Sequence, residues 1–246
     1  MSASARRSEA MAKIRWPQLV RRIHKWLALL IGLQVVFWTA TGFYMVVVHI
    51  DTIHGDHLVH PVSAPSVLLA GLTSPSVAAS TVPGASEVRL ISRLGRPAWR
   101  VQGEDGVAVF DARTGGRLGE LSEAEARAAA KARFAGDAEI VSAVRLTKPL
   151  QEMGKRKPPY WQVEFAGWNR PTLYIAPQTG ELLARRHQLW RAFDFAWMLH
   201  IMDYRDRSDV NNPLLRVATW TALAMALTGA WLLVWAFPRR KKRKSV

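Results

Sequence analysis

The chain has 246 residues, a formal net charge of +15 and no cysteine. The length suits one or two domains, and the lack of cysteine excludes disulfides, thiolate metal sites, iron–sulfur clusters and covalently attached c-type haem. Residues 1–25 hold seven Lys/Arg and one Glu, and residues 239–244 hold six Lys/Arg, so most of the net charge flanks apolar runs. Nucleic-acid binding is therefore the weaker interpretation, because the middle of the chain is nearly balanced.

Two apolar runs predict membrane spans. Between Lys25 and Asp51 lie 25 residues without Asp, Glu, Lys or Arg, and between Arg216 and Arg239 lie 22. Roughly 20 apolar residues cross a bilayer core as a helix. The first run is too long for a cleaved signal peptide and no A-x-A-like site follows it, so we expect a retained signal anchor.

The charges on either side of these runs predict an orientation. We expect transmembrane helices over 26–50 and 213–237, flanked by a basic N-terminus at 1–25 and a basic tail at 238–246. Basic flanks favour the cytoplasm, which puts residues 51–213 on the outer side. In a bacterium the membrane would be the inner (plasma) membrane and the outer side the periplasm.

A histidine-rich arm and linker is expected over residues 51–71. Four His and two Asp fall within twelve residues: His49, Asp51, His54, Asp56, His57 and His60. The last three histidines are spaced by three, so a helical continuation of the span would bring them near one face, and imidazole with carboxylate suits Zn, Cu, Ni or Fe. The alternative is a solvated, polar exit from a membrane helix. Gly55 would weaken any helix over these histidines.

Residues 72–186 contain an internal repeat. Val88–Leu90 resembles Val144–Leu146, Trp99–Val101 resembles Trp161–Val163, and Asp111–Gly115 resembles Ala176–Gly180. The Thr-Gly that ends the last pair suits a turn with positive φ at Gly. Two copies packed together would bury a common core and form one α+β domain.

Each copy is predicted to be one helix followed by three strands. Ser74-Pro75 opens the first helix, and Ser122 with Glu125 forms a capping box at the second. Strands rich in Val, Phe, Trp and Tyr are expected near 99–103, 106–111, 160–166 and 171–176.

An interfacial amphipathic segment is predicted over 187–212. Trp190, Phe193 and Trp197 fall at steps of three or four with either His200 or Ile201, so they form one stripe of a helix that suits the headgroup boundary. Asn212-Pro213 is a good helix start, with an N-cap residue before a proline at the first helical position. His200 is thus expected close to the mouth of the second span.

These features resemble the PepSY domain and the PepSY-associated transmembrane family. The first span opens with Arg22–Leu27, similar to that family's L-H-R-W-L-G entry, and Gly55–Leu58 looks like the G-[DE]-H-L of one branch. Leu199–Tyr204 and Asn211–Leu215 look like that branch's approach to its last helix. The larger relatives have four or more spans, whereas this chain has two predicted ones.

The resemblance implies an α+β membrane protein. Two transmembrane helices would flank a periplasmic PepSY-like domain made of two helix-plus-three-strand repeats. That domain would bind a peptide, a protein or a siderophore-related ligand as an accessory module, with a role in iron or siderophore uptake. The chain has no G-x-S-x-G, H-E-x-x-H or Gly-rich phosphate loop, which favours a non-catalytic role. The expected partners are the lipid bilayer and a membrane or periplasmic protein, and a homodimer stays open.

Two alternatives stay open. Some larger relatives resemble ferric-siderophore reductases that carry b-type haem on membrane histidines, so this chain would be an electron-transfer subunit, with His200 and either His57 or His49 as axial ligands. A peptidase regulator is the other alternative, by analogy of fold alone.

Further side chains are expected to support the histidine pair. In the alternative that these histidines are only structural, they would be hydrogen-bonded to neighbouring polar groups. The supporting side chains are Asp56, Asp203 and Tyr204, with His24 as a basic residue at the inner interface.

Overall fold

The computed structural model describes residues 15–61 and 70–236. The predicted basic tail and most of the predicted basic N-terminus lie outside these residues, as does the middle of the predicted linker. The chain forms two compact units. The first combines Met1–Tyr44 with Ala196–Val246, and the second is Met45–Phe195.

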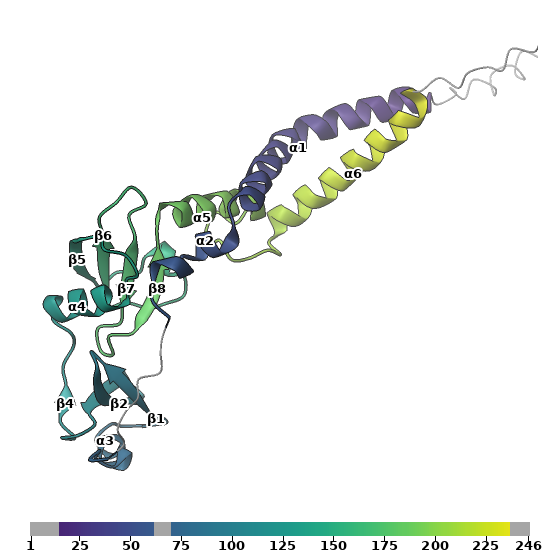
Figure 1. The fold of residues 1–246 in the computed structure, drawn as a ribbon. Helices are drawn as coiled ribbons and strands as arrows, with labels where there is room; N and C mark the ends of the chain where they lie inside the picture. The colour runs from purple at the N-terminus through teal and green to yellow at the C-terminus, as the bar shows by residue number, and fades with distance from the viewer. Residues whose placement is uncertain (1–14, 62–69, 237–246) are drawn as a thin grey trace, which may run out of the picture. The chain divides into compact units, whose positions relative to one another are not determined.

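The first unit is helical. Helices α1 (Trp16–Val47) and α6 (Pro213–Ala236) are long and apolar enough to cross a membrane, and they run antiparallel in Figure 1. Helix α6 begins at the predicted residue, where the Asn212 side chain accepts a hydrogen bond from the Leu215 amide at 2.9 Å. Helix α1 begins ten residues before the predicted span, because Pro17 in its first turn is compatible with a helix start.

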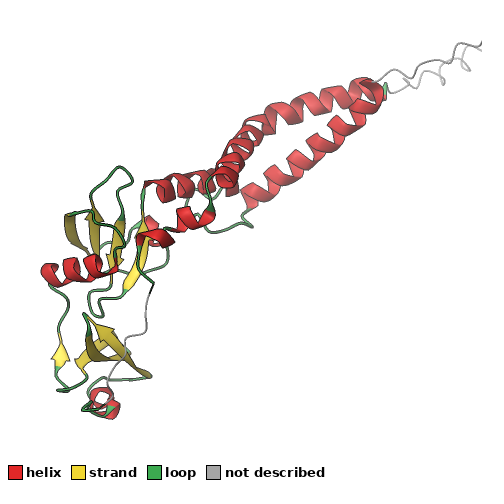
Figure 2. Cartoon of the chain, viewed as in Figure 1, coloured by secondary structure: helices red, strands yellow, loops and turns green. Residues whose placement is uncertain are grey.

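The second unit mixes short helices with strands, coloured red and yellow in Figure 2. Its helical segments are α2 (Ile50–His54), η1 (Asp56–Leu58), α3 (Pro75–Ser80), α4 (Glu123–Arg133) and η2 (Gln151–Met153). Helix α5 (Gln188–Ile201) continues from this unit into the first. The predicted helix starts are confirmed: Ser74 caps α3 ahead of Pro75, and Ser122 with Glu125 forms a capping box on α4.

Two antiparallel sheets complete the second unit. The first sheet has the order β1 (Glu87–Arg93), β2 (Arg96–Gly103), β3 (Gly106–Asp111), β4 (Arg117–Leu118). The second has the order β5 (Ile140–Leu146), β6 (Tyr160–Phe165), β7 (Thr172–Ile175), β8 (Leu182–Arg186).

Each sheet therefore has four strands, and the prediction of three strands after each helix was wrong. Gly115 and Gly180 both have φ of 75° at the predicted turns, so the chain reverses there and pairs a further strand with the third. That the two halves arose from one repeated sequence stays a prediction.

Helix α4 covers one face of the second sheet and forms the largest apolar core (Figure 1). Phe134 at its end stacks on Phe165 with ring centroids 4.0 Å apart. On the other face, Met153 packs with Tyr160 and Tyr174. All four residues of β7 are buried because this strand has a covered face on both sides.

The arm that follows α1 packs onto this same sheet. Leu58 and Val59 lie against the core under α4, and the Leu58 carbonyl accepts from the Ala135 amide at 2.9 Å. Helix α2 ends at His54, because Gly55 adopts φ of 71°. At Val59 the backbone has reached an extended conformation. The continuous helix expected to align His54, His57 and His60 on one face is therefore not formed.

Candidate functional site

The Gly55–Leu58 segment fits tightly against the end of β8. A Cβ added to Gly55 would lie 3.1 Å from Leu58 Cδ1 and 3.2 Å from His187 Cδ2, so only glycine suits both the positive φ and the close approach. Asp56 forms an ion pair with Arg185, whose Nε also donates to the His54 carbonyl at 2.8 Å. The Asp56 carboxylate, predicted to support a histidine pair, thus binds an arginine.

His187 is a buried histidine that sequence reasoning missed. Its Nε2 lies 3.1 Å from the Ile53 carbonyl, which can only accept, so Nε2 carries the proton. Its Nδ1 accepts from the Trp190 amide at 3.3 Å, which leaves no lone pair for a metal. Burial lowers the pKa of His187, although the Ile53 carbonyl opposes that effect. No spacing to other histidines marks it in the sequence, and its position between a strand and a helix was the only available signal.

The exposed ring of His57 lies beside His187, with ring centroids 6.2 Å apart. His49 caps α2, where its Nδ1 accepts from the Asp51 amide at 3.3 Å. In the described ranges, 15–61 and 70–236, no group of three or more His, Asp or Glu side chains is placed to hold a metal ion. Metal binding by the histidine-rich arm stays a prediction without a formed site.

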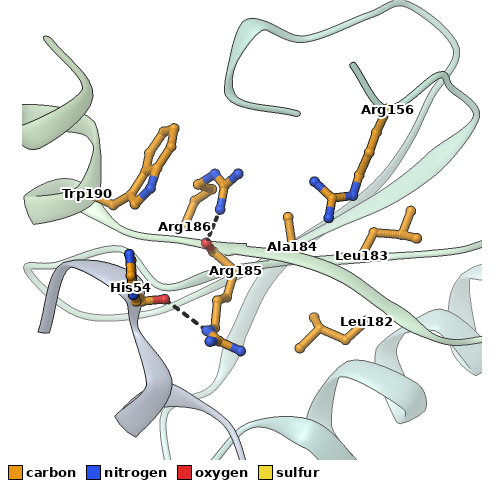
Figure 3. A pocket seen from close by; sticks show the side chains of 8 residues that line it. All are labelled: His54, Arg156, Leu182, Leu183, Ala184, Arg185, Arg186 and Trp190. Atoms are coloured by element: carbon orange, nitrogen blue, oxygen red, sulfur yellow. Dashed lines mark hydrogen bonds between the residues drawn. The ribbon is translucent and has the colours of Figure 1, made fainter. Parts of the chain in front are cut away.

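A cavity of about 320 Å³ lies along β8, which is an edge strand of the second sheet. Its lining is rich in cations: His54, Arg156, Leu182, Leu183, Ala184, Arg185, Arg186 and Trp190. Figure 3 shows Arg156, Arg186 and Trp190 on one side of the strand, and Arg185 turned the other way toward His54. This split follows from the alternation of side chains along a strand.

Backbone contacts and an aromatic ring hold Arg186 in this cavity. Its Nε donates to the Glu152 carbonyl at 2.9 Å and its Nη1 to the Arg185 carbonyl at 2.7 Å. Its guanidinium carbon lies 4.0 Å from the centroid of the Trp190 ring, a cation–π contact. Burial lowers the pKa of Arg186 and the Glu152 charge raises it, but an arginine stays protonated in either case.

The Glu152 carboxylate itself is engaged elsewhere. Arg191 Nε donates to it at 2.9 Å, and the Tyr174 hydroxyl donates to its other oxygen. Burial and this carboxylate raise the pKa of Tyr174. The network fastens η2 and the first turn of α5, which carries Trp190, to the second sheet.

A second constellation lies in the helical unit. His200 Nδ1 is 2.9 Å from the Thr41 hydroxyl, which itself donates to the Phe37 carbonyl at 2.6 Å. The hydroxyl must therefore accept from Nδ1–H, and a neutral ring has its lone pair on Nε2. A Cβ on Gly42 would lie 4.0 Å from His200 Cε1, and the Trp197 ring is nearly parallel to the imidazole.

His24 makes the same kind of contact with Thr228-Gly229 of α6 as His200 makes with Thr41-Gly42 of α1. Its Nδ1 lies 3.0 Å from the Thr228 hydroxyl and 3.2 Å from the Met225 carbonyl. A carbonyl only accepts, so Nδ1 again carries the proton. A Cβ on Gly229 would lie 3.1 Å from His24 Cε1. His24, which was expected to be a basic residue at the inner interface, thus has its ring packed against α6 at Gly229.

Asp203 organises the loop between α5 and α6. One carboxylate oxygen accepts from the Asp209 and Ser208 amides at 3.0 Å, and the other from the Arg205 and Asp206 amides at 3.2 Å. These hydrogen bonds from backbone amides, above all those from Asp209 and Ser208, lower the pKa of Asp203 to about 2. Its predicted role beside a histidine stays a prediction.

Two further predictions concern this region. Tyr204, also expected to support a histidine, has 51% of its surface exposed. The prediction that His57 or His49 pairs with His200 joins residues of two different units, and it stays a prediction.

The comparisons with known proteins give one match. A family model described as the PepSY-associated TM region matches residues 21–246. No curated protein and no solved structure matches the chain.

Proposed function

The chain belongs to the PepSY-associated transmembrane family, and from this premise we propose that it is a membrane-anchored binding protein. The unit of residues 45–195 would recognise a ligand, and α1 and α6 would hold it at the membrane. The protein would serve as a non-catalytic accessory to uptake of iron or of siderophores. Its membrane would be the bacterial inner membrane, with the sheets in the periplasm and both basic ends in the cytoplasm.

The cavity along β8 carries this proposal. It has a volume of about 320 Å³ and combines cationic groups with Trp190 and the leucines of β8, and this volume lies at the lower end of the range for ligand pockets. Ferric complexes formed by deprotonated oxygen ligands are commonly anionic, so a cationic lining suits part of such a complex.

Ligand-induced stabilisation tests the proposal. Full-length protein in mild detergent would be heated with a panel of ferric siderophores of the carboxylate, catecholate and hydroxamate classes, and with the iron-free chelators. A ligand at 100 times its Kd should stabilise the fold by about 2.7 kcal/mol, seen as a rise in Tm. If no member of the panel raises Tm, the proposed role in iron uptake is rejected.

A second candidate function is electron transfer with haem b, favoured by two histidines of the helical unit, His24 and His200. In His200 and in His24, the Nδ1–H is held by a threonine, and a neutral ring would present Nε2, as an axial ligand requires. Each ring would supply one ligand to a haem iron. His24 and Thr41 are 17 residues apart on α1, about 25 Å at 1.5 Å per residue, so the two histidines cannot share one haem. Bound haem b would supply one-electron transfer at these positions.

Absorption spectra separate the two candidates. Purified full-length protein would be recorded oxidised and then reduced with dithionite, after expression with added haem precursor. A Soret band that sharpens on reduction and disappears in His200→Ala supports the haem candidate. A colourless, folded protein eliminates it and leaves the binding protein.

A further inference from the structure

The cavity along β8 has two cationic groups that form no direct ion pair with the described residues. Arg185 is paired with Asp56, but no carboxylate oxygen lies within 4.0 Å of the Arg156 or Arg186 guanidinium in residues 15–61 and 70–236. Glu152, whose backbone carbonyl accepts from Arg186, has its carboxylate bound by Arg191.

The Arg186 guanidinium is also preorganised for binding an anion. Two backbone carbonyls and the Trp190 ring hold its guanidinium in place, so little side-chain entropy is left to lose on binding. These contacts use Nε and one hydrogen of Nη1, and Nη2 remains available. Arg156 is exposed on the loop before β6, and Figure 3 shows its side chain reaching over Ala184 in the same cavity.

We propose that this cavity binds the phosphate group of a phosphorylated ligand, with Arg156 and Arg186 as its two partners. Two guanidinium groups without an ion pair match the charge of a phosphate monoester, whereas a single carboxylate would neutralise only one of them. Planar guanidinium forks bind phosphate oxygens through paired, charge-assisted hydrogen bonds. The inference rests on the proposed function, since it names the ligand class of the same cavity.

The phosphate could belong to a soluble compound or to a lipid headgroup, and His54 in the cavity lining follows α1 closely along the chain. The test uses the full-length protein in non-ionic detergent. Tm would be followed by tryptophan fluorescence during titration with inorganic phosphate, with dihexanoyl phosphatidic acid and with dihexanoyl phosphatidylcholine. Sodium chloride at matched ionic strength controls for screening.

Arg156→Gln is the main variant, because this side chain is exposed and makes no ion pair that folding requires. It should weaken phosphate binding at least about tenfold, the effect of losing one charge-assisted contact. Arg186→Gln should do the same if it folds. Arg127→Gln is the matched control, since it removes an arginine from an exposed pair with Glu123 on α4 and should leave phosphate binding unchanged.

The outcomes separate cleanly. Saturable stabilisation by inorganic phosphate that Arg156→Gln weakens supports the inference. An added response to phosphatidic acid, but not to phosphatidylcholine, identifies a lipid source, and no such response identifies a soluble one. Stabilisation that matches sodium chloride, or that Arg156→Gln leaves unchanged, overturns it. Binding of ferric chelates without phosphate binding would overturn this inference alone, and the reverse would overturn only the role in iron uptake.

Discussion

Single glycines and threonines set the positions of the histidines in this protein. Gly55 has positive φ and admits the His187 ring at close range. Gly42 and Gly229 each face a histidine of the helical unit, His200 and His24, whose Nδ1 bonds to the preceding threonine. At Gly55 and Gly229 the missing Cβ leaves space for an imidazole, whereas at Gly42 an added Cβ would lie in ordinary van der Waals contact with the ring.

Gly55→Ala should destabilise the protein by more than backbone strain alone. An alanine with φ near 71° costs about 1 to 2 kcal/mol, and its Cβ would also crowd Leu58 and His187. The measurement is Tm of the full-length protein in detergent. Gly95→Ala is the control, because Gly95 also has positive φ but nothing within 4 Å of an added Cβ. Equal losses in the two variants would contradict the close fit at His187.

Thr41→Val should destabilise the helical unit by about 1 to 3 kcal/mol, because it leaves the His200 Nδ1–H without its acceptor. Thr39→Val is the matched control two residues away. The Thr39 hydroxyl is exposed and bonds only to the Val35 carbonyl of its own helix, so its loss should change Tm little. A similar Tm for both variants would show that the contact with His200 contributes nothing.

At the level of segments, loops in this chain are held by acidic side chains that bind backbone amides. Asp203 accepts from four amides and so closes the turn that leads into α6. Asp111 does the same at the turn after β3, where the Thr114 and Arg113 amides lower its pKa. Glu125 closes the capping box of α4.

Asp203→Ala should loosen the loop before α6, because four amides lose their acceptor. We expect faster protease cleavage between residues 203 and 212 than in wild type, with Asp206→Ala, an exposed neighbour, as the control.

The pH dependence of this contact has a defined sign. The pKa of Asp203 is lowered to about 2 in the folded protein, so the contribution of this carboxylate is complete above its unfolded pKa of roughly 4. It declines as the pH falls toward 2. Below pH 2 the cleavage difference should vanish, which an acid-stable protease would measure; a constant difference down to that pH would contradict the assignment.

Across the whole chain, the two ends build the helical unit and the middle forms the mixed unit. If both candidate spans, α1 and α6, cross the membrane, the start of α1 and the end of α6 lie on the same side. The basic flanks predict that this side is the cytoplasm. The absence of cysteine allows this to be tested with single introduced thiols.

Three single-cysteine variants of the full-length protein would report the orientation. Asp105→Cys, at the exposed turn between β2 and β3, should react with a membrane-impermeant maleimide in intact cells. Ser8→Cys and Ser245→Cys should react only after the membrane is permeabilised. Labelling of the terminal variants in intact cells would reverse the proposed orientation.

The sequence alone determined the features that depend on local chemistry. The apolar runs, the helix start at Asn212-Pro213, the capping box at Ser122 and the Thr-Gly turns are confirmed, because length, side-chain caps and positive φ act within a few residues. The family resemblance, carried by short motifs, is confirmed as well.

Only the tertiary structure decided which side chains meet. The fourth strand of each sheet, the buried His187 and the ion pair of Asp56 with Arg185 depend on contacts between residues far apart in the chain. The cationic cavity likewise depends on Arg156 and Arg186 lying together on one side of β8. Spacing in a sequence reports the period of one helix or strand, and it carries no record of which segments pack together.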